Sequence, residues 1–169
     1  MSLTMDDRDG VIWFDGRLLP WREVRTHVLS HALHYGSAVI EGERIYEGRV
    51  FRLAAHSARL INSARLLDYD LRWSREEIDE ATRTVVKANN LSSGYIRPIA
   101  WRGSEVMGVS AIGTNVHLAI APWNLDGQLS VQAKPGGISV TMADYRRPGP
   151  EVAPGQSKAA GLYLSLIHI

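Results

Sequence analysis

The chain has 169 residues, 45% of them hydrophobic and 22% charged, which suits one small globular domain, or a small domain and the start of a second. Its net charge of +1, with both signs scattered along the chain, argues against the basic stripe that neutralises nucleic-acid phosphates. The absence of cysteine excludes a disulfide framework and a thiolate zinc site.

Neither a membrane span nor a secretory signal is expected. The longest apolar runs are far too short to cross a bilayer. The N-terminal residues, MSLTMDDRDG, are polar and acidic, whereas a signal peptide begins basic and becomes apolar. We therefore expect a cytoplasmic protein without a membrane or nucleic-acid partner.

The N-terminal part of the chain predicts two hairpins with a short helix between them. Apolar residues flank Asp15-Gly16, a pair typical of a hairpin turn, and Glu47-Gly48 predicts a second turn. Between the turns, residues 27–35 predict a short helix or turn that ends at Gly36, followed by an extended segment over residues 37–46.

Two longer helices are expected next. Apolar residues recur at helical spacing from His56 to Leu67, which predicts an amphipathic helix. Ser74 followed by Glu77 is a capping-box pattern, and it predicts the start of a second helix that ends near Asn89.

Two apolar segments beyond these helices, residues 95–101 and 116–123, predict further strands of the same sheet. Hairpins and helices that follow and separate the strands favour antiparallel pairing. We therefore expect an α/β fold of the α+β type, in which an antiparallel sheet and two helices form a small N-terminal domain.

The composition changes after Trp123, where turn-forming residues become frequent. We expect the small domain to cover residues 1–123, a linker to cover residues 124–136, and the incomplete start of a second domain to cover residues 137–169.

This second unit predicts a strand over residues 138–142 and a helix that begins at Ser157, whose side chain could cap it. One strand and part of a helix cannot enclose a core, so we expect the natural protein to continue beyond Ile169.

The chain has three lysines, and each can be considered as a nucleophile that binds a carbonyl group. Such a lysine must lose its proton, which requires burial or nearby positive charge. Lys87 lies on a predicted helix and Lys134 in the predicted linker, so both are expected to be surface charges. Lys158 lies among small residues that would let a planar cofactor approach the backbone, although spacing alone favours a surface lysine here too.

Four blocks of the sequence carry a family resemblance. They are HVLSHALHYGSAVIEGERIY at 27–46, FRLAAHSARLINSA at 51–64, NNLSSGYIRP at 89–98 and SKAAGLYLS at 157–165. In this order they resemble successive motifs of the branched-chain amino acid aminotransferases, and four ordered blocks are more specific than any single motif. The resemblance implies the N-terminal part of a class IV, fold-type IV aminotransferase that binds pyridoxal 5'-phosphate, uses amino acid and 2-oxo acid substrates, and forms a homodimer or higher homo-oligomer.

The resemblance also implies roles for three residues at the cofactor. Lys158 is expected to hold it covalently and to carry the proton between substrate and cofactor. Arg59 is expected to contact the phosphate, which a guanidinium fork suits, and Tyr163 to hydrogen-bond the phenolic oxygen. Without the resemblance, an exposed helix arginine and a core tyrosine would be favoured.

Strand alternation predicts that Tyr95 and Arg97 share one face of their segment with Ile99 and Trp101. A buried arginine needs an anionic partner, and an internal salt bridge would supply one. The resemblance implies instead that Arg97 receives the side-chain carboxylate of glutamate in a pocket that otherwise takes aliphatic side chains. It further implies a substrate pocket lined by Tyr35, Ile40, Gly42, Arg44 and Tyr95, with Val109 on a loop that reaches the neighbouring subunit's site.

His27, His31 and His34 are spaced so that one helical face could carry three imidazoles, which raises the possibility of a zinc site. No carboxylate or further ligand supports that site, and the family shows this block without a metal. We expect histidines that hydrogen-bond the backbone and no bound metal.

Some positions depart from the family pattern. The family usually has an aromatic residue where this chain has Ile40, an aliphatic residue at Glu43 and asparagine at Leu162, so the preferred amino acid stays open. The last residues, Ile167 to Ile169, also differ from the family helix, which suggests a truncated or frame-shifted reading frame.

The expected activity of the full-length protein is exchange of an amino group between leucine, isoleucine or valine and 2-oxoglutarate. A D-amino-acid transaminase and an aminodeoxychorismate lyase share the fold, but the YIRP block favours the branched-chain interpretation. A different hypothesis is that this chain, by itself, is a non-catalytic fragment, because the expected remainder would carry further cofactor-binding groups.

Overall fold

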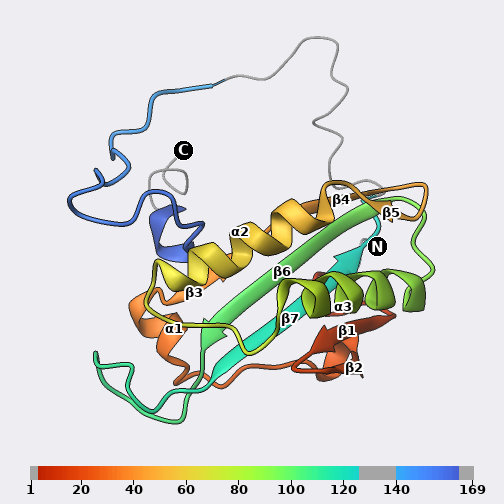
Figure 1. Ribbon diagram of the computed structural model, residues 1–169, viewed down its shortest axis with the longest axis horizontal. Helices are drawn as coiled ribbons and strands as arrows, with labels where there is room; N and C mark the ends of the chain where they lie inside the picture. Colours follow the sequence, from red (N-terminus) through yellow and green to blue (C-terminus); the bar gives the residue numbers. More distant parts are fainter. Residues whose placement is uncertain (1–3, 126–139, 164–169) are drawn as a thin grey trace.

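The computed structural model describes residues 4–125 and 140–163. Helices α2 and α3 lie against one face of an antiparallel sheet (Figure 1), which confirms the predicted fold class. The strands are β1 (Val11–Phe14), β2 (Arg17–Pro20), β3 (Ala38–Ile40), β4 (Glu43–Tyr46), β5 (Arg49–Val50), β6 (Gly94–Arg102) and β7 (Val116–Trp123). The helices are α1 (His31–Tyr35), α2 (Leu53–Arg65) and α3 (Arg75–Ala88), with short 3₁₀ turns at η1 (Trp21–Glu23) and η3 (Ala160–Tyr163).

Strand β6 lies at the centre of the sheet. It pairs antiparallel with β7 along one edge and with β4 and β3 along the other, in the overall order β2-β1-β7-β6-β4-β5 with β3 beside β6. Both predicted hairpin turns are present. Asp15-Gly16 has φ values of 49° and 96° and Glu47-Gly48 has values of 50° and 73°, the positive angles that a tight hairpin turn requires.

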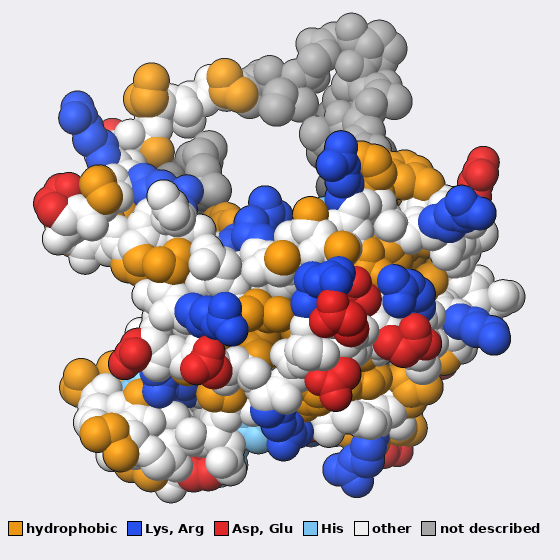
Figure 2. All heavy atoms as spheres, viewed as in Figure 1, with side chains coloured by type: hydrophobic (Ala, Val, Ile, Leu, Met, Phe, Trp, Pro, Cys, Tyr) orange, Lys and Arg blue, Asp and Glu red, His pale blue; other side chains and the backbone are white. Residues whose placement is uncertain are grey.

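The two long helices are close to their predicted positions. Helix α2 begins at Leu53 rather than His56, and α3 begins with the expected capping box. In that box the Glu77 backbone N–H donates to the Ser74 hydroxyl (3.2 Å) and the Ser74 N–H donates to the Glu77 carboxylate (2.7 Å). Acidic and basic side chains are mixed over the outer surfaces of these helices, with apolar side chains between them (Figure 2). None of the described helices is long and apolar enough to cross a membrane.

The two faces of the sheet carry different side chains because residues alternate along β6. Ile96 and Ala100 point toward α2 and α3 and join the main hydrophobic core with Ile45 of β4, Leu60 of α2 and Val85 of α3. This core fixes the helices on the sheet, so the opposite face is the one left to carry polar functional groups.

On that opposite face, Ile99 and Trp101 belong to a second apolar cluster, which also contains Trp21. Tyr95 and Arg97 lie on the same face, as their hydrogen bond to each other requires. The alternation predicted for this strand is therefore confirmed, and the two polar residues project away from the helix-covered core.

The predicted helix at Ser157 is wrong. A 3₁₀ turn at Ala160–Tyr163 follows Ser157 instead, and the Ser157 hydroxyl donates to the carbonyl of Ser63 (2.9 Å) rather than capping a helix. The reason is that α2 and β3 supply hydrogen-bond partners for this segment. Its backbone groups therefore do not need the hydrogen bonds that a helix would provide.

The predicted strand over residues 138–142 is wrong where it can be seen, because Val140–Met142 has no strand pairing, while residues 138 and 139 lie outside the described part of the chain. Most of the predicted linker, residues 126–136, and Lys134 with it, also lie outside that part. The boundary after Trp123 therefore stays a prediction.

Glu43 occupies an unusual position in the core. It lies on β4 on the same face as Ile45, and only 1% of its surface is exposed. Neither carboxyl oxygen has a hydrogen-bond partner among the described residues. Burial, together with the nearby charges of Glu41 and Asp79, raises the pKa of Glu43 to about 8. The side chain is therefore a neutral acid in the folded protein at neutral pH.

We predict that replacing Glu43 with isoleucine stabilises the protein at mildly alkaline pH. The folded state keeps a proton that the unfolded chain releases above its ordinary pKa of 4.5, so the free energy of unfolding falls as the pH rises toward about 8. Glu43→Ile should remove this dependence and gain about 1–3 kcal/mol near pH 8. Urea unfolding followed by tryptophan fluorescence at about pH 5 and about pH 8 measures both effects.

Glu43→Gln is the matched control, since it removes the titration but keeps a polar group in the core. It should flatten the pH dependence with a smaller gain in stability than isoleucine. The explanation is wrong if the wild-type protein and both variants lose stability equally between the two pH values.

Candidate functional site

The segment that carries Lys158 is attached to the edge of β3 and to the end of α2. The Ile40 N–H donates to the carbonyl of Lys158 (3.1 Å), and Val39 and Ala159 form an antiparallel bridge. The Lys158 N–H donates in turn to the Ser63 hydroxyl (3.0 Å). Backbone groups thus fix the position of Lys158 on both sides.

Two glycines allow this segment to approach α1 closely. Gly36 ends α1, as predicted, and adopts the left-handed conformation (φ 67°). A Cβ built on Gly36 would lie 3.5 Å from the Cα of Gly161. A methyl group there would make an ordinary van der Waals contact, so the positive φ of Gly36 is the stronger reason for glycine at this position.

Lys158 and Tyr163 carry the functional side chains of this segment, and the two are in contact. The Lys158 Nζ donates to the Tyr163 hydroxyl at 3.0 Å and lies 5.7 Å from the centre of its ring. The amine and the phenol therefore face one another across the 3₁₀ turn. Lys158 as a whole is partly buried.

Arg59 of α2 joins this group through a buried carboxylate that was not singled out from the sequence. Its guanidinium donates through Nε and Nη2 to Glu41, with an Nη2–Oε2 distance of 2.6 Å, and His56 Nδ1 lies 2.9 Å from the same carboxylate. Arg59 also interacts electrostatically with Tyr163. The Glu41 side chain is fully buried, whereas 52% of the Arg59 side chain is exposed.

The charges of this cluster are mutually stabilising. Burial by itself raises the pKa of Glu41, but hydrogen bonds from Arg59 and His56 outweigh it and hold that pKa below its ordinary value. The hydrogen bond to Glu41 likewise raises the pKa of Arg59. A charged, partly exposed guanidinium is thus fixed near Tyr163, the hydrogen-bond partner of Lys158.

The candidate substrate residues of β4 and β6 lie together on the helix-free face. Arg97 Nη2 donates to the Tyr95 hydroxyl (3.3 Å), and its guanidinium lies 5.5 Å from the centre of the Tyr95 ring. The salt bridge considered for Arg97 is not present among the described residues. Arg44 pairs with Tyr95 across the strands, and its Nε is buried without a hydrogen-bond partner among those residues.

Gly42 is required by the position of Tyr95. A Cβ at Gly42 would overlap the Tyr95 hydroxyl and ring carbons. Gly42 therefore gives Tyr95 the space in which its hydroxyl meets Arg97. Five of the predicted residues, Ile40, Gly42, Arg44, Tyr95 and Arg97, come from the three adjacent strands β3, β4 and β6 and the turn between the first two.

Tyr35 and Val109 lie apart from this group, at the surface of the chain. Tyr35 is 43% exposed at the end of α1, and Val109 is 79% exposed on the loop between β6 and β7. The two are linked through His31, whose Nε2 lies 3.2 Å from the Val109 carbonyl and whose ring packs on Tyr35. The expectation that this loop reaches a neighbouring subunit stays a prediction.

The three histidines do not share a helical face. His27 precedes α1, and its Nδ1 accepts from the Leu29 N–H (3.1 Å), while His34 Nε2 lies 3.1 Å from the Val28 carbonyl. Within residues 4–125 and 140–163, no group of three or more His, Cys, Asp or Glu side chains could hold a metal ion. These imidazoles bind backbone groups nearby.

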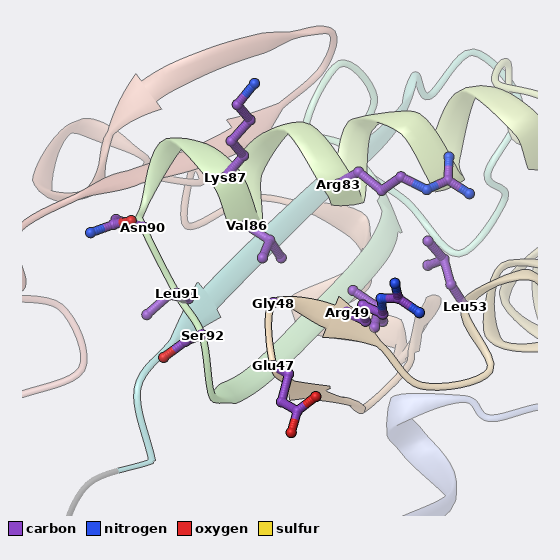
Figure 3. Close-up of a pocket in the computed structure, with 11 residues that line it drawn as sticks. Glu47, Gly48, Arg49, Leu53, Arg83, Val86, Lys87, Asn90, Leu91 and Ser92 are labelled. Carbon is purple, nitrogen blue, oxygen red and sulfur yellow. The ribbon is translucent and has the colours of Figure 1, made fainter.

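A cavity of 630 Å³ lies elsewhere, between α3 and the β4–β5 hairpin (Figure 3). Arg49 and Leu53 line it on the hairpin side, and Arg83 and Val86 on the helix side. None of the predicted site residues takes part in it. The candidate site is therefore identified by its side-chain chemistry and not by cavity size.

We predict that Arg59→Leu destabilises the protein by about 1–3 kcal/mol at neutral pH, because it leaves the buried Glu41 carboxylate with only His56 and the Gly42 N–H as partners. The loss should shrink as the pH falls below about 4.5, where Glu41 takes up a proton in the unfolded chain and then in the folded one. A double-mutant cycle with Glu41→Gln, measured by urea unfolding, tests the coupling. Strictly additive changes in the free energy of unfolding would contradict the coupling between Arg59 and Glu41.

Comparison with known proteins supports the resemblance noted from the sequence blocks. The model of the family "Amino-transferase class IV" matches residues 38–165. A branched-chain-amino-acid aminotransferase of Pseudomonas aeruginosa is 44% identical over 167 residues, which cover 96% of this chain and 54% of that protein. The chain thus spans about half the length of the curated relatives that it matches.

Solved structures of the same group share the fold. The Escherichia coli branched-chain amino acid aminotransferase superposes with a TM-score of 0.88 at 36% identity, covering 96% of this chain and 55% of that one. An aminotransferase from Brucella abortus, bound to the cofactor PLP, gives a TM-score of 0.76 at 28% identity, covering 95% of this chain and 56% of that one. The chain therefore belongs to the class IV aminotransferases and has part of their fold.

Proposed function

We propose that the full-length protein transfers an amino group between a branched-chain L-amino acid (leucine, isoleucine or valine) and 2-oxoglutarate, with pyridoxal 5'-phosphate as cofactor. The observation that carries this proposal is the Lys158 amine held 3.0 Å from the Tyr163 hydroxyl on the edge of β3. The names of the curated relatives favour branched-chain substrates over the D-amino acid and aminodeoxychorismate alternatives.

The donor set of the site fits pyridoxal 5'-phosphate. A primary amine suits the aldehyde, a phenol suits the phenolic oxygen of the ring, and an exposed guanidinium suits the phosphate. Lys158, Tyr163 and Arg59 supply these three groups, and Tyr163 interacts with each of the other two. The bound cofactor would stabilise the negative charge that develops at the substrate Cα.

Each of these residues has a distinct task in the proposal. The Lys158 amine, in its neutral form, acts as nucleophile and then carries the proton removed from the substrate Cα. Tyr163 accepts a hydrogen bond from the Lys158 amine, and its hydroxyl would be available to hold the phenolic oxygen of the cofactor. Glu41 fixes the Arg59 guanidinium by two hydrogen bonds, so its exposed side would be available to hold the phosphate.

The helix-free face of β4 and β6 suits both proposed substrates. An aliphatic side chain needs apolar walls, for which Ile40 and the ring of Tyr95 are available, whereas 2-oxoglutarate needs a cation for its side-chain carboxylate. Arg97 has no acidic partner among the described residues and is held by Tyr95 alone, so it is free to bind that carboxylate. Arg44, on the neighbouring strand, adds a second positive charge on this face.

Assembly and location are part of the same proposal. We infer a homodimer or higher homo-oligomer, in which Val109 reaches the site of the neighbouring subunit, and a cytoplasmic protein. A chain without cysteine is compatible with a reducing compartment. Size-exclusion chromatography with light scattering on the full-length protein measures the oligomer size.

The first test is whether Lys158 binds the cofactor. The full-length protein, incubated with pyridoxal 5'-phosphate, should turn yellow, and treatment with borohydride should fix the cofactor on the peptide that contains Lys158. Lys158→Ala should lose both the colour and the transamination of leucine. A colourless wild-type protein, or a cofactor fixed on another lysine, would overturn the proposed function.

Arg97 should determine the use of the dicarboxylate. Arg97→Leu should raise KM for 2-oxoglutarate by about 10- to 100-fold, because a charge-assisted hydrogen bond contributes about 1.5–3 kcal/mol. Kinetics with leucine and an aliphatic 2-oxo acid provide the internal control and should change little, since neither has a side-chain carboxylate. An equal rise in KM for both acceptors would mean that Arg97 has only a structural role.

A further inference from the structure

The loop between β6 and β7, residues 103–115, is closed at its base by main-chain and side-chain hydrogen bonds. The Gly103 N–H donates to the Asn115 carbonyl (2.8 Å), and the Asn115 N–H donates to the Glu105 carboxylate (2.9 Å). His117 Nε2 lies 3.4 Å from the other oxygen of Glu105. These contacts fix the two ends of the loop but do not reach its tip.

The tip of the loop has little packing of its own. Its large apolar side chains, Val106, Met107, Val109 and Ile112, are all exposed. Side-chain burial therefore contributes little to holding the tip in place. Within this chain, the position of the tip then depends on hydrogen bonds to its backbone, one of which runs from the Arg102 guanidinium to the Ala111 carbonyl (3.5 Å).

His31 supplies such a hydrogen bond. His31 is 4% exposed, and its Nε2 lies 3.2 Å from the Val109 carbonyl, a contact between residues far apart in the sequence. A carbonyl can only accept, so Nε2 carries the hydrogen. Nδ1 lies 2.7 Å from the Ser37 hydroxyl, which can donate to it and fix the orientation of the ring.

His31 also links this loop to Tyr35. The two rings have centroids 4.7 Å apart, and the His31 backbone N–H donates to the Gly103 carbonyl (2.8 Å) at the base of the loop. One buried side chain thus contacts the loop tip, the segment before β3 and the aromatic ring at the end of α1. A shift of the imidazole would displace Val109 and Tyr35 together.

We propose that His31 is a positioning residue that holds Val109 and Tyr35 as one rigid unit, and that this unit sets the shape of the pocket for the aliphatic side chain of the substrate. The inference rests on the proposed function for the statement that Tyr35 and Val109 line that pocket. The attachment of the loop itself rests only on the contacts of His31.

Substitutions can separate the roles of the two ring nitrogens of His31. His31→Gln can place an amide N–H near the position of Nε2 and so keep the hydrogen bond to the Val109 carbonyl. The shorter side chain of His31→Asn can keep the contact with the Ser37 hydroxyl but loses the one to Val109. His34→Gln is the matched control, because His34 lies on the same helix and next to Tyr35 but bonds to Val28 instead. Ser37→Ala releases Nδ1 without altering His31, which keeps the test open if an exchange at His31 prevents folding.

Hydrogen exchange of the full-length protein, measured by mass spectrometry, tests the attachment of the loop. In His31→Asn, peptides covering residues 104–115 should exchange about 3- to 10-fold faster, the factor expected for loss of one hydrogen bond, while β6 and β7 stay protected. His31→Gln should restore most of the protection, Ser37→Ala should lose part of it, and His34→Gln should behave as the wild type. Unchanged exchange of this loop in both His31→Asn and Ser37→Ala would overturn the proposal.

Steady-state kinetics with leucine and valine test whether this unit sets the shape of the substrate pocket. His31→Asn should raise KM for both by about 3- to 10-fold with kcat within about twofold, and glutamine should rescue KM. A faster-exchanging loop with unchanged KM would overturn the role in the pocket. A wild-type protein without transaminase activity would instead defeat the proposed function, while the exchange data would still decide whether His31 holds the loop.

Discussion

The candidate site depends on one antiparallel contact, the pairing of the Lys158 segment with the edge of β3. Residues 157–163 have no long helix of their own, and their position is fixed by backbone bonds to β3 and by Ser63 of α2. Because β3 pairs with β6, the lysine is connected through β3 to the strand that carries Tyr95 and Arg97. The amine and the cation that we assign to the substrate are therefore held by one sheet.

A buried acid organises the other side of the site. Glu41 would be costly to bury as a charge, and two cationic or polar partners from α2 neutralise it. The same interaction fixes the arginine that we assign to phosphate. Glu43, two residues further on, has no such partner among the described residues and stays protonated. Neighbouring carboxyl groups thus differ in charge because only one of them faces a guanidinium.

Local features could be predicted from the sequence, and distant pairings could not. The turn at Asp15-Gly16 and the capping box at Ser74 depend on residues a few positions apart, so the sequence pattern was sufficient for both. The Glu41–Arg59 pair depends on how α2 packs against the sheet, and no local pattern predicts that packing. At Ser157 the prediction that a serine caps the following helix was wrong, because the Ser63 carbonyl of α2 accepts the hydrogen bond of its hydroxyl. The roles of the site residues came from the family resemblance alone and stay proposals.

The alternation of β6 also limits how this chain can evolve. A change in side-chain identity at one position affects one face of the sheet, whereas the insertion or deletion of a single residue would exchange the two faces from that point onward. Arg97 would then turn toward α2 and α3, and the apolar partners of Leu60 and Val85 would turn outward. Length variation in this strand is therefore expected to abolish both fold and activity, and diversity among functional relatives should accumulate by substitution there and by insertion only in loops.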